Sequence, residues 1–131
     1  MADVSKAHIA SVRTVGVPVT DQDRALEFYV YTLGFEKHLD APLPQLGGRW
    51  IEVAPPESAI TIALTPAHEK SPAGVDTGIR FTTDDATSLH SELAARGVAV
   101  DELLRWEGMP PMFDFRDPDG NVLYVSQSED A

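Results

Sequence analysis

The stretch VPVTDQDRALEFYVYTLGF, residues 17–35, predicts a strand, a helix and the start of a second strand. Thr20 or Asp21 offers a helix N-cap, because a side-chain oxygen there can accept a hydrogen bond from a free backbone N–H. Apolar residues then recur at helical spacing, at Leu26, Tyr29, Val30 and Leu33. Gly34 ends this helix, since glycine readily adopts the left-handed conformation that follows a helix C-terminus.

The residues around this stretch complete a first structural unit. Valines alternate with smaller residues before the helix, at Val15, Val17 and Val19, as in a strand with one apolar face. Three further strands are predicted after it, at residues 35–39, 49–53 and 59–65. Prolines and glycines place a loop at 42–48 and a turn at 54–58.

The same order recurs in the second half of the chain at an offset of about 61–64 residues, after a linker at 67–76. A strand at 78–82 precedes a helix that Asp84 is expected to cap and Gly97 to end. A short strand follows at 98–100, and residues 112–116 and 122–126 form a hairpin around the turn DPDGN, residues 117–121. We therefore expect one α+β domain, residues 1–131, with two βαβββ modules at 10–66 and 77–127.

The stretch at 17–35, taken together with FRDPDGNVLYV at 115–125, resembles the vicinal oxygen chelate superfamily. This group contains glyoxalases, bleomycin-resistance proteins and extradiol dioxygenases, and the resemblance runs from about Val12 to Gln127. It implies two βαβββ modules that form a curled mixed sheet around a cavity, usually within a homodimer. It does not specify one activity.

The composition narrows the function classes. The chain of 131 residues has no cysteine, which excludes disulfides and thiolate chemistry. Its net charge of −11 disfavours a nucleic-acid partner, because a phosphate backbone would be repelled. No apolar run is long enough to span a membrane. We expect a cytoplasmic protein whose partners are a small molecule and a second copy of the chain.

Strand alternation predicts two chemically different sheet faces. The apolar face, which should pack against the helices, contains Val15, Val17, Val19, Ile60, Ile62, Leu64, Ile79, Phe81, Phe113, Phe115, Leu123 and Val125. The other face mixes aromatic, charged and small residues, and contains Thr14, Gly16, Trp50, Glu52, Thr61, Ala63, Gly78, Arg80, Asp114, Arg116, Val122 and Tyr124. This mixed face suits a ligand, and the alternative is a dimer contact.

A metal site is not expected. Metal-dependent members of the superfamily place one His, Gln or Glu ligand on each of four strands, and the resemblance matches those positions to Thr14, Ala63, Gly78 and Tyr124. Ala63 and Gly78 have no donor atom in their side chains, and a neutral Thr and a Tyr form a poor pair. The histidines at 8, 38, 68 and 90 lack ligand spacing. We therefore expect neither a metal nor another cofactor, which disfavours metal-dependent glyoxalase or dioxygenase activity.

The predicted ligand-binding residues are Thr14, Trp50, Glu52, Thr61, Arg80, Trp106, Met112, Asp114 and Tyr124. Arg80 could bind a carboxylate or phosphate, or pair internally with Asp114 or Glu52. Tyr124 could hydrogen-bond a ligand or fill the space of the missing metal. Glu52 and Asp114 are the plausible acid or base groups on this face, and no catalytic residue is assigned.

Three functions fit this sequence. The first is a metal-free small-molecule-binding protein of the sequestration type, whose overall acidity would suit a cationic ligand. The second is a glyoxalase- or dioxygenase-like lyase, isomerase or oxidoreductase with an atypical site. The third is a non-catalytic dimeric scaffold.

Overall fold

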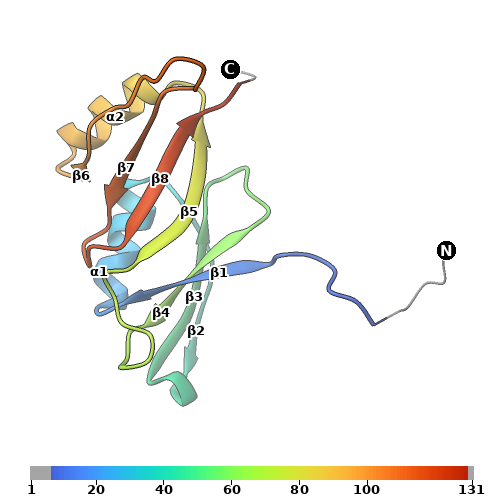
Figure 1. Cartoon of the computed structure of the whole chain (residues 1–131). Helices are drawn as coiled ribbons and strands as arrows, with labels where there is room; N and C mark the ends of the chain where they lie inside the picture. Colours follow the sequence, from blue (N-terminus) through green and yellow to red (C-terminus); the bar gives the residue numbers. More distant parts are fainter. Residues whose placement is uncertain (1–6, 130–131) are drawn as a thin grey trace.

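The computed structural model describes residues 7–129 and contains two four-stranded sheets, each accompanied by one helical segment (Figure 1). The first module consists of β1 (Thr14–Val19), α1 (Gln22–Leu26), the π-helical turn η1 (Glu27–Thr32), β2 (Glu36–Leu43), the 3-10 helix η2 (Pro44–Leu46), β3 (Gly48–Ala54) and β4 (Thr61–Pro66). The second consists of β5 (Asp76–Thr83), α2 (Ala86–Ala95), β6 (Ala99–Val100), β7 (Met112–Arg116) and β8 (Val122–Gln127). Among these residues, no helix has the length and apolar character needed to cross a membrane.

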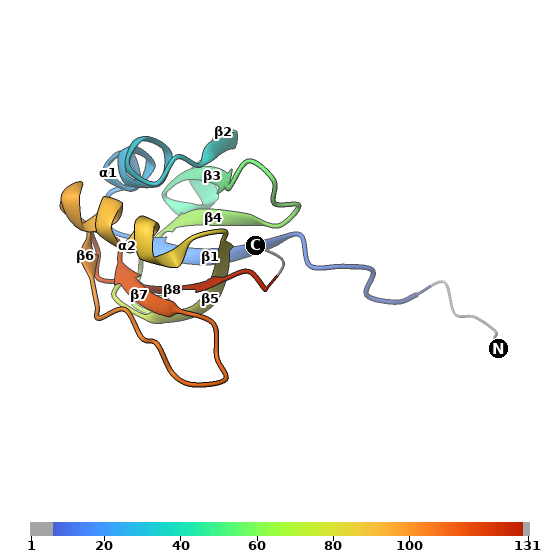
Figure 2. The same cartoon turned by 90° about the horizontal axis from the view of Figure 1, so that it is seen from above.

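The two sheets have the same topology, with strand orders β1-β4-β3-β2 and β5-β8-β7-β6. In each sheet the first strand of the module pairs in parallel with the last, and the remaining pairs are antiparallel. The α+β class and the two βαβββ modules are thereby confirmed. The sheets stay separate, because β1 and β5 are edge strands that do not pair with each other, and they form two neighbouring layers in Figure 2.

Aspartates cap both helices. The Asp21 side chain accepts a hydrogen bond of 3.0 Å from the backbone N–H of Arg24. Of the two N-cap residues predicted, Thr20 and Asp21, the structure therefore has Asp21. The second helix is capped by Asp85 and not by Asp84 as predicted. Asp85 is the residue with an extended backbone directly before the helix, and its carboxylate accepts a 3.0 Å bond from the N–H of Ser88.

The first helix differs from a regular α-helix after Leu26. It continues as a π-helical turn in which the N–H of Leu33 bonds to the carbonyl of Phe28, five residues earlier. This wider turn buries Tyr29 completely and leaves Tyr31 82% exposed. A 3.6-residue periodicity does not distinguish this arrangement from an ordinary helix.

The second strand is longer than predicted. Residues 35–39 were expected to form it, with a loop from 42 to 48, yet β2 continues to Leu43 and pairs with β3 as far as Leu43 and Gly48. Pro42 is accommodated because β2 is an edge strand, where a missing N–H costs no interior hydrogen bond.

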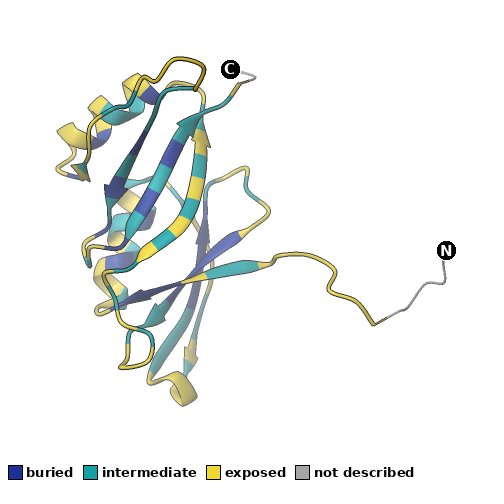
Figure 3. Cartoon of the chain, in the orientation of Figure 1, coloured by how far each residue is buried: buried dark blue, intermediate teal, exposed yellow. Residues whose placement is uncertain are grey.

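The core lies between the sheets and the helices (Figure 3). Most of the predicted apolar face is buried there: Val17, Val19, Ile62, Leu64, Phe113, Phe115, Leu123 and Val125 are each at most 3% exposed. Val15, Ile79 and Phe81 are only half-buried. Ile60 is wrong as a core residue, because β4 begins one residue later and the Ile60 side chain is 43% exposed.

The turn at 117–121 joins the two modules. The amide of Asn121 is fully buried and donates 2.9 Å hydrogen bonds to the carbonyl of Pro18 and to Asp117. Its carbonyl oxygen accepts bonds from the N–H groups of Gly74 and Val75 in the linker. The sequence predicts only a hairpin turn here and does not indicate this network.

Candidate ligand-binding site

The structure divides the predicted ligand-binding residues into two groups that lie in different modules. Thr14, Trp50, Glu52 and Thr61 come together on the first sheet, where β1, β3 and β4 are neighbours. Arg80, Trp106, Met112, Asp114 and Tyr124 line one cavity beside the second sheet. A single site containing all of these residues is not formed within residues 7–129.

The first group is a closed hydrogen-bond network around the Glu52 carboxylate. Oε2 of Glu52 accepts bonds from the Arg13 guanidinium at 2.6 Å and from the Trp50 indole at 2.7 Å. Oε1 accepts a 2.9 Å bond from the Thr61 hydroxyl, which lies 2.8 Å from the hydroxyl of Thr14. All four polar side chains around Glu52 are therefore engaged with the protein itself.

The electrostatics of this network make Glu52 a weak base. Burial alone would raise the pKa of Glu52, but the hydrogen bonds from Trp50 and Thr61 and the charge of Arg13 outweigh burial and lower it. Glu52 is 4% exposed, so its carboxylate is not accessible to a ligand from solvent. Glu52 and Thr61, which the sequence predicts as ligand-binding residues, are buried in this network because β1, β3 and β4 pack their polar groups against one another.

The second group borders a cavity of about 370 Å³, which we call the Arg80 pocket. Its lining consists of Arg80, Leu104, Trp106, Met112, Phe113, Asp114, Tyr124, Val125 and Ser126. The residues from β5, β7 and β8 reach it because these strands are neighbours and their side chains alternate between two faces. Leu104 and Trp106 come from the segment between β6 and β7.

The Arg80 guanidinium lies over the ring of Tyr124 beside this pocket. The two residues are paired in the parallel register of β5 and β8, and the guanidinium carbon lies 4.4 Å from the centre of the tyrosine ring. A register shift between Asp76 and Arg80 precedes the pair, and Gly78 lies within it at φ +71°. That left-handed conformation is open to glycine at little cost, so Gly78 fixes which residue of β5 faces Tyr124.

The carboxylates near Arg80 are bound to other groups. Asp76 accepts a 2.7 Å bond from the Tyr124 hydroxyl, and this bond, with burial, raises the pKa of Tyr124. The Arg116 guanidinium lies 2.9 Å from Asp101 and 3.9 Å from Asp114. An internal ion pair of Arg80 with Asp114 or Glu52, the alternative left open by the sequence, is not formed.

Asp114 is the acidic member of the pocket. Burial and a hydrogen bond to Asp101, together with the negative charge of Asp101, raise the pKa of Asp114 despite the nearby Arg116. The sequence does not predict Asp76 as a site residue, because it falls in the predicted linker. Leu104 is not predicted either, because no strand pattern surrounds it. The parallel pairing of β5 with β8 is the signal that connects Asp76 to Tyr124.

Trp106 supplies an accessible aromatic surface. Its side chain is 59% exposed although it lines the pocket, and Met112 lines the same pocket from β7. A tryptophan that is neither in the core nor covered by the described chain offers a flat apolar face for stacking. Trp106 is therefore not a core residue, whereas Trp50 belongs to the Glu52 network.

The four positions of the superfamily's metal site do not fit a metal. The Thr14 hydroxyl is engaged with Thr61, Ala63 and Gly78 offer no side-chain donor, and the Tyr124 hydroxyl donates to Asp76. Among residues 7–129, no group of three or more His, Cys, Asp or Glu side chains is gathered so that it could hold an ion. A metal-assisted reaction has no support from these residues.

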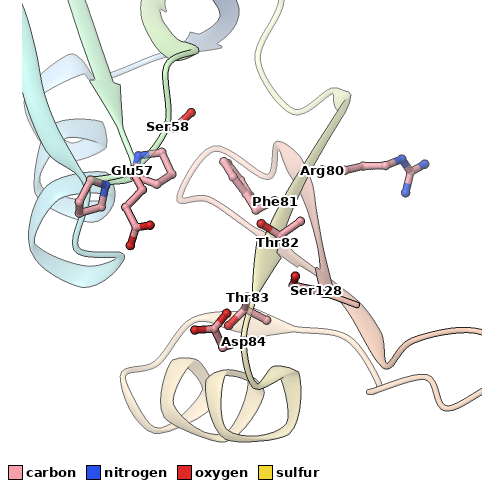
Figure 4. Close-up of a pocket in the computed structure, with 10 residues that line it drawn as sticks. Glu57, Ser58, Arg80, Phe81, Thr82, Thr83, Asp84 and Ser128 are labelled. Carbon is pink, nitrogen blue, oxygen red and sulfur yellow. The ribbon is translucent and has the colours of Figure 1, made fainter. Parts of the chain in front are cut away.

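A second, larger cavity of about 520 Å³ lies between the two modules. It lies between the turn at 55–58 and residues 80–84 at the end of β5, and Figure 4 shows Phe81 directed toward that turn while Arg80 points the other way. Glu57 and Asp84 border it, and Arg80 is its sole cationic lining residue. Because the guanidinium of Arg80 points away from this cavity, the cavity does not combine a cation with an exposed aromatic ring as the Arg80 pocket does.

Comparison with known proteins gives similarity over nearly the whole described chain. The family model of the Glyoxalase/Bleomycin resistance protein/Dioxygenase superfamily matches residues 7–125. TnmS3, an antibiotic binding protein from Streptomyces sp. CB03234, is 36% identical, with a TM-score of 0.81 over 92% of this chain and 98% of that chain. A superfamily member from Sphaerobacter thermophilus DSM 20745 is 35% identical, with a TM-score of 0.80 over the same shares. Uncharacterized protein YetH of Bacillus subtilis (strain 168) is 27% identical over 124 residues, 91% of this chain and 99% of that protein.

Proposed function

Since this chain belongs to the Glyoxalase/Bleomycin resistance protein/Dioxygenase superfamily, we propose that it is a metal-free protein that binds and sequesters a small molecule in the Arg80 pocket. One observation carries the proposal. A cavity of about 370 Å³ combines a guanidinium that has no counter-ion among residues 7–129 with an aromatic ring that is more than half exposed. The volume lies within the range typical of small-molecule sites, about 300–1,000 Å³.

The chemistry of the pocket supports binding more than catalysis. A binding site needs apolar walls and a few polar groups to orient the ligand, which Trp106, Met112 and Arg80 supply. A catalytic site needs a free acid or base close to the reacting atoms. Glu52 lies outside the pocket in its own network, and Tyr124 holds its proton in the bond to Asp76. Asp114 lines the pocket, but its carboxyl group is engaged with Asp101.

The similarity to TnmS3 supports the same conclusion. That protein is described as antibiotic-binding, and it shares 36% of its residues and nearly all of its length with this chain. A ligand of the size of a small antibiotic or metabolite would occupy the pocket and stack on Trp106. The bound molecule would be held without change, and release would return it intact.

The chain is further proposed to work as a homodimer in the cytoplasm. Ile9 is 95% exposed and Val12 62% exposed on a segment that extends away from both sheets (Figure 2). The edge strands β1 and β5 each have one hydrogen-bonded neighbour and could be covered by a second copy. Light scattering after size-exclusion chromatography tests this, and a monomer at micromolar concentration would contradict it.

A thermal-shift screen tests the binding function. The protein is heated with members of a library of antibiotics and aromatic metabolites, and a bound compound raises the midpoint because it binds only the folded state. Trp106→Ala should abolish most of each shift. Tyr31→Ala removes an exposed aromatic residue outside the pocket and should leave the shifts unchanged. Compounds that stabilise the wild-type protein and Trp106→Ala equally would place binding elsewhere.

A further inference from the structure

Arg80 differs from every other arginine of the chain. Within residues 7–129 its guanidinium forms neither an ion pair nor a hydrogen bond, and its partner is the face of Tyr124 at 4.4 Å. The arginines that form ion pairs with carboxylates are Arg13, Arg24, Arg49, Arg96 and Arg116. Arg105 donates to the hydroxyl of Thr87. Among the described residues, Arg80 thus lacks a carboxylate partner at this cavity.

The contact with Tyr124 leaves the N–H groups of this guanidinium without a hydrogen-bond acceptor among residues 7–129. A guanidinium whose carbon lies over an aromatic ring still has N–H groups that can donate to an oxyanion in a bidentate fashion. The ring contact also holds the side chain in place, so less freedom is lost when a ligand binds. Arg80 is therefore prepared to receive an anion.

The neighbouring carboxylates form no direct ion pair with Arg80 among residues 7–129. Asp76 is occupied by the Tyr124 hydroxyl at 2.7 Å, and Arg116 lies closer than Arg80 to Asp114. The net charge of −11 acts on a ligand mainly from a distance. Salt screens such distant charges beyond about 8 Å at physiological ionic strength, whereas a direct contact is screened much less.

The apolar part of the pocket sets the shape of the ligand. Trp106 presents an exposed indole, and Met112 and Leu104 line the same cavity with flexible apolar side chains. A flat aromatic ring would cover these groups and remove them from water. The cation and the flat apolar surface border one cavity, so one molecule can contact both.

We propose that the Arg80 pocket selects planar aromatic anions, with a carboxylate or sulfonate at the edge of Arg80 and the ring system against Trp106. This inference depends on the proposed binding function and specifies its ligand class. It reverses the expectation of a cationic ligand that the acidic composition suggests. The charge beside the ligand decides the preference, not the charge of the whole protein.

Three probes with one ring system test the inference: naphthalene-1-acetate, naphthalene-1-acetamide and 1-naphthylmethylammonium, titrated by calorimetry at neutral pH. The wild-type protein should bind the anion about tenfold or more tighter than the amide, and the cation most weakly. Arg80→Gln should reduce the affinity for the anion to that for the amide. Lys70→Gln changes the net charge equally on an exposed residue outside the pocket lining and should preserve the order.

The outcomes separate the two proposals. A cation that binds as tightly as the anion, or an order that survives Arg80→Gln, overturns the charge preference and leaves the binding function standing. If none of the three probes binds saturably, while the thermal-shift screen also finds no compound, both proposals fail. Saturable binding of the amide alone also contradicts the anion preference.

Discussion

The Tyr29 hydroxyl donates a 2.9 Å hydrogen bond to the Asp117 carboxylate, although the two residues are 88 positions apart and belong to different modules. Tyr29 is fully buried and Asp117 is 5% exposed. Burial and the charge of Asp117 raise the pKa of Tyr29 well above its usual range, so the phenol keeps the proton that it donates. The bond holds the π-helical turn of the first module against the turn that carries β8.

Removing this bond should loosen the junction between the modules. Tyr29→Phe keeps the ring but leaves a buried carboxylate with one donor fewer, and the free energy of unfolding should fall by about 1.5–3 kcal/mol. Denaturant unfolding measures the change. Tyr31→Phe alters the same group on an 82% exposed side chain and should change stability by less than about 0.5 kcal/mol. Equal effects of the two substitutions would contradict a role for the junction.

Gly78 should be required for the register that places Arg80 opposite Tyr124. Gly78→Ala introduces a side chain at φ +71°, which should lower the free energy of unfolding by about 1–2 kcal/mol. Space is not the cause, since an added Cβ would meet no atom within 4 Å. Gly16→Ala is the matched control, because Gly16 also lies in a strand with open space but lacks a positive φ. If both substitutions cost the same, strain at Gly78 is not the explanation.

The Glu52 network should stabilise the fold only while Glu52 is ionised. Its pKa is lowered in the folded protein, so its contribution is present above the unfolded-state pKa and disappears as pH falls through the folded-state pKa. Glu52→Gln should therefore cost about 1–2 kcal/mol at pH 7 and progressively less below about pH 4. Denaturation curves at several pH values measure this difference. A cost that is independent of pH would contradict the charged network.

Glu69 provides the control for the stability cost of Glu52→Gln, because it is an exposed glutamate in the linker. Glu69→Gln removes the same charge without disturbing a buried network. Its effect on stability at pH 7 should stay below about 0.5 kcal/mol.

Asp114 should oppose the binding of an anion to the Arg80 pocket. Its pKa is raised by burial and by Asp101, so its negative charge is lost on acidification sooner than that of an ordinary aspartate. The affinity for naphthalene-2-sulfonate, which stays ionised, should rise as pH falls through the pKa of Asp114. Asp114→Asn should raise the affinity about threefold at pH 7 and remove part of the pH dependence. Weaker binding by Asp114→Asn would show that the carboxylate assists the ligand.

The sequence allowed the fold to be predicted because its signals are local and repeated. Valine alternation, aspartate caps and glycine stops specify each element separately, and the same order occurs twice. Alternation also predicted that Arg80, Asp114 and Tyr124 share one face, since adjacent strands align their side chains.

The remaining features depend on contacts between distant residues, which local patterns do not encode. The closed network of Glu52 arises because β3 and β4 bring Trp50 and Thr61 onto it. The π-helical turn has hydrogen bonds between residues five positions apart, where an α-helix has four. The apolar spacing of the sequence predicts a helix in either case. Asn121 looks like a turn residue in sequence, and only the fold brings the carbonyl of Pro18 to it.

The two tryptophans provide the most direct test of the Arg80 pocket as the binding site. Trp106 lines it, whereas the Trp50 indole is bonded to Glu52 in the other module, and each gives one indole N–H signal in a ¹H–¹⁵N spectrum. Trp106→Phe assigns the two signals. During titration with naphthalene-1-acetate and its amide, the Trp106 signal should shift saturably and the Trp50 signal should stay in place. A saturable shift of Trp50 with Trp106 unmoved would contradict the account.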